Sequence, residues 1–514
     1  MLNVTLYNTL SRAAEPLETR VLGKVSVYCC GPTVYDVPHI GHARAALMPD
    51  VLVRLLRSKG LEVEYVRNIT DVDDKILARA AQTGEPPLEL SRRMADVYRS
   101  QMAALGCLEP THEPRVSEHI EPIVRLVAVL VDGGHAYVLD RGAGVRDVYF
   151  SVRSYPDYGK LSRRKIDELV AGARVERDEL KRDPLDFALW KGAPADEWGW
   201  ESPWGRGRPG WHIECSAMSQ HYLGDGIDVH AGGMDLIFPH HENEIAQSEA
   251  ANPAGKPFAR FWLHNGFVNI DKEKMSKSLN NFVSVSDVFD RNDPEAFRWF
   301  LLGAHYRGPI QFETEVLDDR SLAFPGVDEA EHRVDYLYAT VNRLRKKEKE
   351  TIPIPARTSK KMLALRDAAE RVFGQAEAAL SDDLNTPVAL AGLGELARIG
   401  NEAMDLAQRH RKDPTFSAGA VIVAKAVLER IARVSKWLGV MQTSPEAYSS
   451  RTRTRRLALQ GLREQDIQQL VAERAQARRD KDFSRSDAIR DRLLAHRISL
   501  RDSAEGTEWT VEAR

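Results

Sequence analysis

The chain has 514 residues, a formal net charge of −3, 29% charged residues and four cysteines. This length is too great for one hydrophobic core and, at roughly 100–200 residues per domain, predicts three to five domains. No apolar run reaches the roughly 18 residues of a membrane span, the first residues lack a signal-peptide pattern, and the few cysteines exclude a disulfide scaffold, so we expect a cytoplasmic protein.

Near the N-terminus the sequence predicts a strand, a turn and a helix in succession. The strand covers residues 24–30, the turn is Gly31-Pro32 and the helix covers 41–59, as at the start of a nucleotide-binding βα unit. The turn lacks the Gly-x-Gly-x-x-Gly fingerprint, which disfavours a dinucleotide. His39 and His42 lie three residues apart at the helix N-terminus, where backbone N–H groups favour phosphate. They indicate a triphosphate site; the alternative is a helix-capping histidine and a core histidine.

A second strand over residues 61–66 completes a βαβ unit, with a right-handed crossover expected. Thr70 follows this strand, at the end where polar side chains face the ligand crevice of a parallel sheet. The alternative is that Thr70 or Asp71 caps the next helix. Helical patterns then cover residues 88–107 and 115–133.

After these helices the pattern becomes strand-like, as at residues 148–152, and loops rich in Gly, Pro and Trp follow as far as Pro209. We interpret residues 113–205 as an insertion. It separates two halves of one catalytic domain, residues 1–112 and 206–262.

A second strand-turn-helix pattern follows the insertion. Residues 227–230 predict a short strand, 231–235 its terminal turn, and 238–244 the start of a helix with Pro239 near its beginning. Two such units side by side predict an α/β fold with a doubly wound, Rossmann-like parallel sheet and a crevice between the units. Asp235 lies at the end of its strand and is our candidate to bind the ribose hydroxyls of adenosine.

The second half of the chain is predominantly helical. We expect a connector with a polar loop over residues 263–325, an all-α helical bundle over 326–440, and a linker with a small C-terminal domain over 441–514. Residues 441–458 are rich in Ser, Thr and Arg, which is typical of a flexible linker, and one charged helix is expected from about 464 to 496.

The C-terminal helix carries a basic surplus interleaved with aspartates. Such a pattern usually means a solvated helix with ion pairs between successive turns. Trp509 offers a ring that can stack on a base, which instead favours nucleic-acid binding. The basic residues are Arg474, Arg478, Arg479, Lys481, Arg485, Arg490 and Arg492.

Four residues are candidate metal ligands. His240 and Glu244 share a helix face, and Cys30 and Cys215 end segments that we expect to meet at the crevice. Two sulfurs, one nitrogen and one oxygen suit zinc, and without a Cys-x-x-Cys pair a closed structural finger is not expected. The alternative is buried thiols and a surface histidine. Cys29 and Cys30 point to opposite faces of the strand, so one of them belongs to the core.

Lys274 and Lys277 lie three residues apart in the polar loop of residues 271–280. Over a bound triphosphate their charges would neutralise the departing pyrophosphate. A solvated basic loop is the commoner meaning of two such lysines.

Two motifs, Pro38-His39-Ile40-Gly41-His42 and Lys274-Met275-Ser276-Lys277-Ser278, resemble the signatures of class I aminoacyl-tRNA synthetases, in the same order. The resemblance to the cysteine-specific branch of that family rests on four further segments and extends from about residue 24 to Trp509. The segments are residues 30–36, 67–71, 209–215 and 238–244.

The resemblance implies an enzyme that ligates L-cysteine to its tRNA through a cysteinyl-adenylate, with Mg²⁺ accompanying ATP. It implies that the four candidate ligands bind zinc, with Cys30 chosen over Cys29, and that Thr70, Trp211 and His230 line the amino-acid pocket. The reaction has two steps, formation of the cysteinyl-adenylate and transfer of cysteine to tRNA. Neither step needs an enzyme nucleophile, so catalysis depends on alignment and on charge stabilisation at the phosphates. The expected catalytic and ATP-binding residues are His39, Gly41, His42, Asp235, Lys274 and Lys277.

One zinc ion per chain would explain how the enzyme rejects serine. An ordinary pocket separates such isosteres by only ~10–200-fold. Zinc prefers a soft thiolate to a hydroxyl and lowers the pKa of a bound thiol, so an editing domain is not needed.

Two rival functions share parts of this sequence pattern. One is a ligase that transfers cysteine to a small amino sugar, as in mycothiol synthesis; the other is a non-catalytic nucleic-acid-binding paralogue. The intact signatures and the long C-terminus argue against both. In the family the small C-terminal domain receives the tRNA anticodon, and we expect a monomer.

Overall fold

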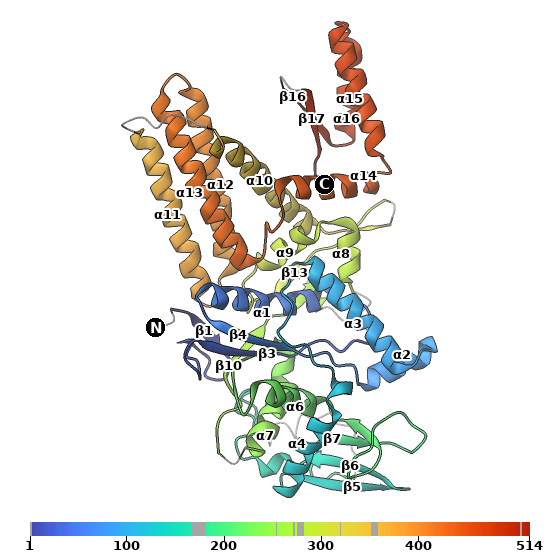
Figure 1. The fold of residues 1–514 in the computed structure, drawn as a ribbon. Helices are drawn as coiled ribbons and strands as arrows, with labels where there is room; N and C mark the ends of the chain where they lie inside the picture. Colours follow the sequence, from blue (N-terminus) through green and yellow to red (C-terminus); the bar gives the residue numbers. More distant parts are fainter. Residues whose placement is uncertain are drawn as a thin grey trace. The chain divides into compact units, whose positions relative to one another are not determined.

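The structure is a computed structural model that describes residues 3–165, 180–252, 254–270, 273–274, 282–318, 320–350, 358–503 and 506–513 (Figure 1). The chain divides into two compact units. The first contains Met1–Val285 with two short later segments, Ala304–Gln311 and Ala379–Asn385, and the second contains the rest. Among the described residues, no helix has both the length and the apolarity that crossing a bilayer requires.

A parallel four-stranded sheet of order β10–β9–β3–β4 forms the centre of the first unit. Apolar residues such as Val27, Val229 and Leu263 are fully buried in it, as expected for a parallel sheet covered on both faces. β3 pairs with β4 on one side and with β9 on the other, which creates a crevice at the carboxyl ends of the strands. The doubly wound fold is therefore confirmed. The strands are β3 (Lys24–Cys29), β4 (Glu62–Arg67), β9 (Ile227–Gly233) and β10 (Ala259–Asn265).

Helices cover both faces of this sheet, with α1 on one side and α6 and α7 on the other (Figure 1). The segment from Trp211 to Cys215 opens α6, whereas the sequence assigned it no element. The helices are α1 (Ile40–Ser58), α2 (Asp74–Thr83), α3 (Pro87–Ala104), α6 (Trp211–Leu223) and α7 (Glu242–Ala250). Two short helical turns, η3 (Met234–Leu236) and η4 (Ile237–His241), lead into α7.

The insertion contains an antiparallel sheet of order β5–β6–β7–β8, where the sequence suggested one strand followed by loops. Trp190 is fully buried and lies 6.3 Å from the ring of Trp204, so aromatic packing outweighs the turn-forming composition. The sheet continues to Pro209, beyond the boundary that we expected at residue 205. The elements are η1 (Val116–Glu118), α4 (Ile120–Asp132), β5 (Ala136–Gly142), β6 (Val145–Phe150), η2 (Val152–Ser154), β7 (Phe187–Gly192) and β8 (Gly207–Pro209).

Long helices occupy the region predicted as a helical bundle. They are α10 (Pro325–Glu348), α11 (Lys360–Ser381), α12 (Thr386–Arg409) and α13 (Pro414–Leu438). The elements that lead from the sheet domain to these helices include α8 (Val285–Arg291), α9 (Pro294–Leu302) and the strand pair β14–β15 (Glu315–Val316, Leu322–Ala323). A separate strand pair, β1–β2 (Thr5–Asn8, Ala13–Pro16), lies near the N-terminus. A further sheet contains β11 (Val268–Ile270), β12 (Glu273–Lys274) and β13 (Ile310–Phe312).

The segment predicted as a flexible linker is instead a helix, α14 (Pro445–Leu459), anchored by buried charges. Arg456 donates to Glu331 at 2.7 Å and to Asp335 at 2.8 Å, and Arg455 also pairs with Glu331. Glu331 is only 3% exposed. The linker prediction is wrong because the arginines of this segment find carboxylates on α10, more than 100 positions away in the sequence.

The C-terminal domain contains two helices and a hairpin rather than one long helix. α15 (Glu464–Arg479) and α16 (Phe483–Ala495) are separated by a turn in which Lys481 has a φ of 62°. The hairpin is β16 (Ile498–Ser503) and β17 (Gly506–Val511). Trp509 is 9% exposed, belongs to the core of this domain and lies under the Arg453 guanidinium at 4.6 Å, so it is not presented to a base. That expectation is wrong.

The buried pairs of α14 give a stability prediction. Glu331→Gln is expected to lower the free energy of unfolding by about 3 kcal/mol, because Arg455 and Arg456 lose their shared buried carboxylate. Glu329→Gln is the matched control. Glu329 lies on the same helix and pairs with Arg333 at the surface, and loss of this surface ion pair is expected to lower the free energy of unfolding by less than about 1 kcal/mol. Urea denaturation compares the two variants. Equal losses would contradict the assignment of the network as the anchor.

Candidate active site and metal centre

The four candidate metal ligands converge at the carboxyl edge of the parallel sheet. Cys30 follows β3, Cys215 lies on α6, His240 lies in η4 and Glu244 lies on the first turn of α7. The Cys30 sulfur is 3.7 Å from the Cys215 sulfur, 3.6 Å from His240 Nε2 and 3.5 Å from Glu244 Oε1. The four donor atoms all lie within 4.8 Å of one another, so the residues are placed to share one ion.

The charges of this cluster suit a cation. The Cys30 thiol donates to Cys215 and lowers the pKa of Cys215 to about 6, whereas burial raises the pKa of Cys30. Burial opposes ionisation of Glu244, but the charges of His230 and His240 outweigh it and hold the pKa of Glu244 well below its usual range. A thiolate and a carboxylate are therefore favoured at neutral pH. Together with a second sulfur and an imidazole they form a donor set that zinc accepts, so the residues fit this metal.

A group of buried histidines surrounds the cluster. His230 Nε2 lies 2.8 Å from Glu244 Oε2, and His241 Nε2 lies 3.4 Å from the Cys30 sulfur. His241 is held in turn by His264, with 2.8 Å between His241 Nδ1 and His264 Nε2. Burial lowers the pKa of His241 and that of His264, the latter to about 3, which keeps both rings neutral. Sequence reasoning missed His241 and His264, although the adjacent pair His240-His241 was visible.

Trp211 and His212 both contact His240. The Trp211 ring stacks on the His240 ring with 4.4 Å between centroids, and His212 Nδ1 lies 3.0 Å from His240 Nδ1. Trp211 is 37% exposed and so borders the cluster on the solvent side. Such contacts fix the orientation of a metal-binding imidazole.

Thr70, the second residue expected to line the amino-acid pocket, is buried beside the cluster. Its hydroxyl accepts from Asn68 Nδ2 at 3.2 Å and donates to Glu214 at 3.4 Å. The capping alternative is wrong, because Asp73 is the N-cap of α2 and accepts from the amide of Lys75. The third residue, His230, is fully buried and reaches the cluster through Glu244.

His39 and His42 lie together at the N-terminus of α1. His39 Nδ1 accepts from the Gly41 amide, His42 Nδ1 accepts from the His39 amide, and the two rings stack with 3.8 Å between centroids. His39 thus caps the helix, as the alternative required, but His42 is only half-buried and is not a core histidine. The capping bonds fix both rings at the helix end that favours phosphate.

The segment that follows the second signature motif, residues 283–285, bonds to the first motif through its backbone. The Ile40 amide donates to the Val283 carbonyl at 3.2 Å, and the Val285 amide donates to the Pro38 carbonyl at 2.9 Å. The chain just after the lysine loop is therefore fixed beside the His39 helix start. The backbone of Lys274 pairs with Asn269 in β12–β11, while its side chain and the whole of Lys277 lie outside the described residues.

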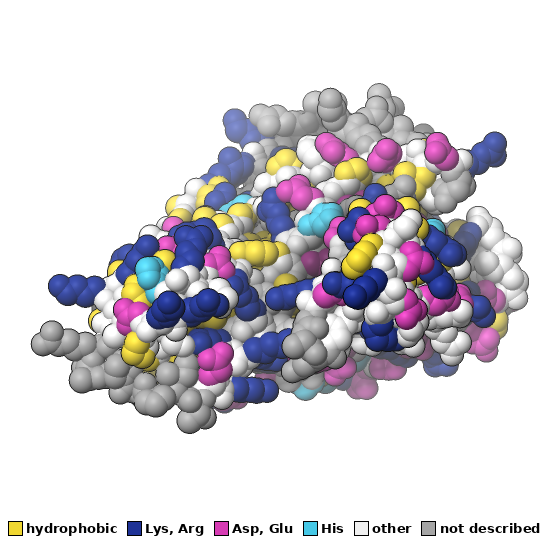
Figure 2. Space-filling model, turned by 90° about the horizontal axis from the view of Figure 1, so that it is seen from above, with side chains coloured by type: hydrophobic (Ala, Val, Ile, Leu, Met, Phe, Trp, Pro, Cys, Tyr) yellow, Lys and Arg dark blue, Asp and Glu magenta, His cyan; other side chains and the backbone are white. Residues whose placement is uncertain are grey.

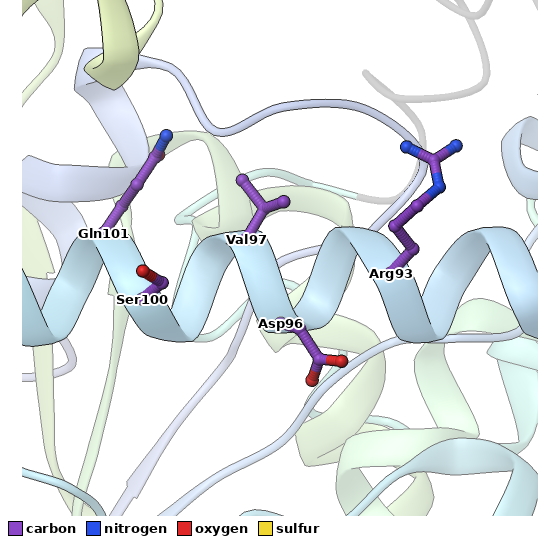
Figure 3. A pocket seen from close by; sticks show the side chains of 5 residues that line it. All are labelled: Arg93, Asp96, Val97, Ser100 and Gln101. Carbon is purple, nitrogen blue, oxygen red and sulfur yellow. The ribbon is translucent and has the colours of Figure 1, made fainter. Parts of the chain in front are cut away.

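Asp235 is exposed in η3, directly after β9, at the same carboxyl edge as Cys30. A separate surface depression lies along α3 (Figure 3). Its charged residues form surface pairs, Arg93 with Glu85 and Asp96 with Arg99, which is not the chemistry of a reaction centre. Its lining residues are Arg93, Asp96, Val97, Ser100 and Gln101.

Three family models match successive parts of the chain. Residues 16–321 match the class I (C) tRNA synthetase catalytic domain, residues 375–442 match the DALR domain, and residues 463–509 match the cysteinyl-tRNA ligase anticodon binding domain.

Curated relatives match over the full length. A cysteine–tRNA ligase of Anaeromyxobacter sp. (strain K) is 49% identical over 516 residues, covering 99% of this chain and 100% of the relative. One of Geobacter metallireducens is 45% identical over 511 residues, with the same coverage. Among solved structures, Mycobacterium tuberculosis methionyl-tRNA synthetase in complex with methionyl-adenylate has a TM-score of 0.61 and 18% identity, covering 82% of this chain and 92% of that chain. The last likeness supports the fold.

The turn after β3 gives a prediction for the site's framework. A Cβ at Gly31 would lie 1.6 Å from the Asn68 carbonyl oxygen, so Gly31→Ala is expected to cost about 3 kcal/mol or more of unfolding free energy, or to prevent folding. In α12, a Cβ at Gly394 would meet no atom within 4 Å, so Gly394→Ala is expected to be neutral or stabilising by about 0.5–1 kcal/mol. Thermal and urea unfolding distinguish the two; similar stabilities would contradict the close approach.

Proposed function

The chain belongs to the cysteine–tRNA ligase family of class I aminoacyl-tRNA synthetases, and from this premise we propose how its residues carry out the reaction. The enzyme uses ATP to ligate L-cysteine to tRNA. The rival small amino-sugar acceptor is not favoured, because residues 463–509 match an anticodon-binding domain. Because its four cysteines are free thiols, which a reducing compartment maintains, we propose a cytoplasmic location for the protein.

For amino-acid selection, we propose that Cys30, Cys215, His240 and Glu244 hold one zinc ion. Bound zinc would supply a soft Lewis acid that takes the substrate's thiolate in preference to the hydroxyl of serine. The convergence of the four donors in a buried cluster supports this assignment. Trp211, stacked on His240 and partly exposed, would border the bound amino acid, and Thr70 would lie beside it.

For activation, the cysteine carboxylate attacks the α-phosphate of ATP and pyrophosphate leaves. We propose that His39, His42 and the amide of Gly41 hold the phosphates at the start of α1, and that Lys274 and Lys277 neutralise the departing pyrophosphate. The backbone bonds that join residues 38–40 to 283–285 support this, because they fix the chain just after the lysine loop beside the first motif. Mg²⁺ would accompany ATP.

For transfer, a terminal ribose hydroxyl of tRNA attacks the adenylate carbonyl and AMP leaves. Asp235, exposed at the end of β9, would bind the ribose hydroxyls of the adenosine. Neither step uses an enzyme nucleophile, so the protein contributes mainly alignment, worth up to ~7–11 kcal/mol.

For tRNA recognition, we propose that the turn between α15 and α16 contacts the anticodon. Phe483 is 63% exposed there and offers a ring for a base, in place of the buried Trp509. Among the described residues, Lys481 beside it has no ion pair, whereas Arg474 and Arg478 both pair with Asp502. On the face presented in Figure 2, basic and acidic side chains are likewise interspersed rather than gathered in one patch. The exposed Phe483 ring with Lys481 beside it is therefore a more specific feature for anticodon binding than the overall basic surplus of the domain.

The zinc assignment predicts the effect of removing one ligand. Cys215→Ala is expected to lose zinc and weaken cysteine-dependent ATP–pyrophosphate exchange, and cysteine-over-serine selectivity is expected to fall to the ~10–200-fold of an ordinary pocket. Metal analysis of the purified protein and exchange assays measure these effects. Cys29→Val is the control, because Cys29 is 2% exposed and is not one of the four converging ligands. Retained zinc and selectivity in Cys215→Ala would refute the mechanism.

The anticodon assignment predicts separate effects on the two steps. Phe483→Ala is expected to lower kcat/KM for tRNA charging by ~10-fold, since stacking on one base is worth about 1–3 kcal/mol, and to leave ATP–pyrophosphate exchange unchanged. Leu494→Ala is the control, because Leu494 is also exposed on α16 but lies at its other end. Equal charging by the two variants would exclude Phe483 as a contact.

A further inference from the structure

A loop of the insertion, residues 155–164, encloses a buried carboxylate on the helix that carries Glu244. The carboxylate belongs to Glu242, which is 0% exposed. Its oxygens accept from the amides of Gly159 at 2.9 Å, Ser162 at 2.7 Å and Leu161 at 3.4 Å. Among the described residues no Lys or Arg pairs with it, so backbone N–H groups of one loop conformation satisfy this charge.

The same loop contacts both ends of the segment that carries His240 and Glu244. The Arg164 guanidinium lies 4.6 Å from the centre of the Phe238 ring, just before His240. At the other end, Glu249 accepts from the Tyr155 hydroxyl and from Lys160.

The helix geometry explains why Glu242 can act on both ligands. His240 and Glu244 are four residues apart and face the metal cluster together. Glu242 lies midway between them, about 200° around the helix, and so faces the insertion loop. Any movement of the helix start away from the loop would leave the Glu242 charge buried without donors, which is costly.

We propose that this loop, acting through Glu242, positions His240 and Glu244 for metal binding, so that the insertion contributes to zinc affinity and to selection of cysteine. Glu242 is a positioning residue and does not contact substrate. The inference rests on the proposed function, namely that the four-residue cluster holds zinc.

Gly159 gives an independent way to disturb the loop. Its φ is +96°, and a Cβ there would lie 2.1 Å from the Arg164 carbonyl oxygen, so alanine would displace the loop without altering α7. Gly144, in the turn between β5 and β6, has a similar φ of +80° and no atom within 4 Å of a built Cβ. Gly144→Ala therefore imposes similar backbone strain in the same insertion and serves as the matched control.

The experiment measures zinc release from the full-length, zinc-loaded protein to a chromogenic chelator. Glu242→Gln keeps the side-chain size but turns an amide N–H toward the loop N–H groups. Glu242→Gln and Gly159→Ala are each expected to release zinc ~10-fold faster, because His240 and Glu244 would lose the support that orients them, and Gly144→Ala is expected to release it at the wild-type rate. KM for cysteine in ATP–pyrophosphate exchange should rise in the first two, with kcat little changed.

Unchanged zinc release in folded Glu242→Gln, judged by circular dichroism, overturns the inference. If that variant does not fold, Arg164→Ala decides: its side chain is exposed, and loss of the contact with Phe238 is expected to speed release by about threefold. Wild-type release from Arg164→Ala would then overturn the inference. A wild-type protein that holds no zinc refutes the proposed function itself, and the inference with it.

Discussion

The buried carboxylate of Glu244 is the group on which the active-site end of the first unit depends. A charge removed from water needs partners, and here they come from three parts of the chain: His230 on β9, His240 on η4 and Cys30 after β3. The strand β9, the turn η4 and the end of β3 are therefore all bonded to the Glu244 carboxylate on α7. The outer histidines extend this arrangement, since His212 contacts His240, and His264 holds His241, which lies beside the Cys30 sulfur.

The parts of the fold that could be predicted are those with a local pattern. The strand over 24–30 and the helix over 41–59 correspond to β3 and α1 within one residue at each end, because apolar periodicity and the Gly31-Pro32 turn mark them. Convergence of Cys30 with His240 and Glu244 followed from topology, since parallel strands end at one edge of a sheet.

The parts that could not be predicted depend on partners distant in the sequence. The Ser, Thr and Arg residues of α14 look like a linker until Arg456 is placed against Glu331. His264 reaches the cluster only through the register of β10 on β9, which sets it opposite Gly232, where a Cβ would meet the His241 ring. Trp509 looked like a binding residue because a sequence does not show that its ring completes a small core.

The contacts of α14 have a consequence for the evolution of the C-terminal part. The matched anticodon-binding module begins at residue 463, yet Leu457 belongs to its core, Arg453 covers Trp509, and Arg456 donates to the Val511 carbonyl. The edge of the matched family model is therefore not the edge of the packed core. A gene fragment that starts at residue 463 would encode a domain without part of its own interior, so recombination of this module between proteins is expected to preserve a junction upstream of Pro445.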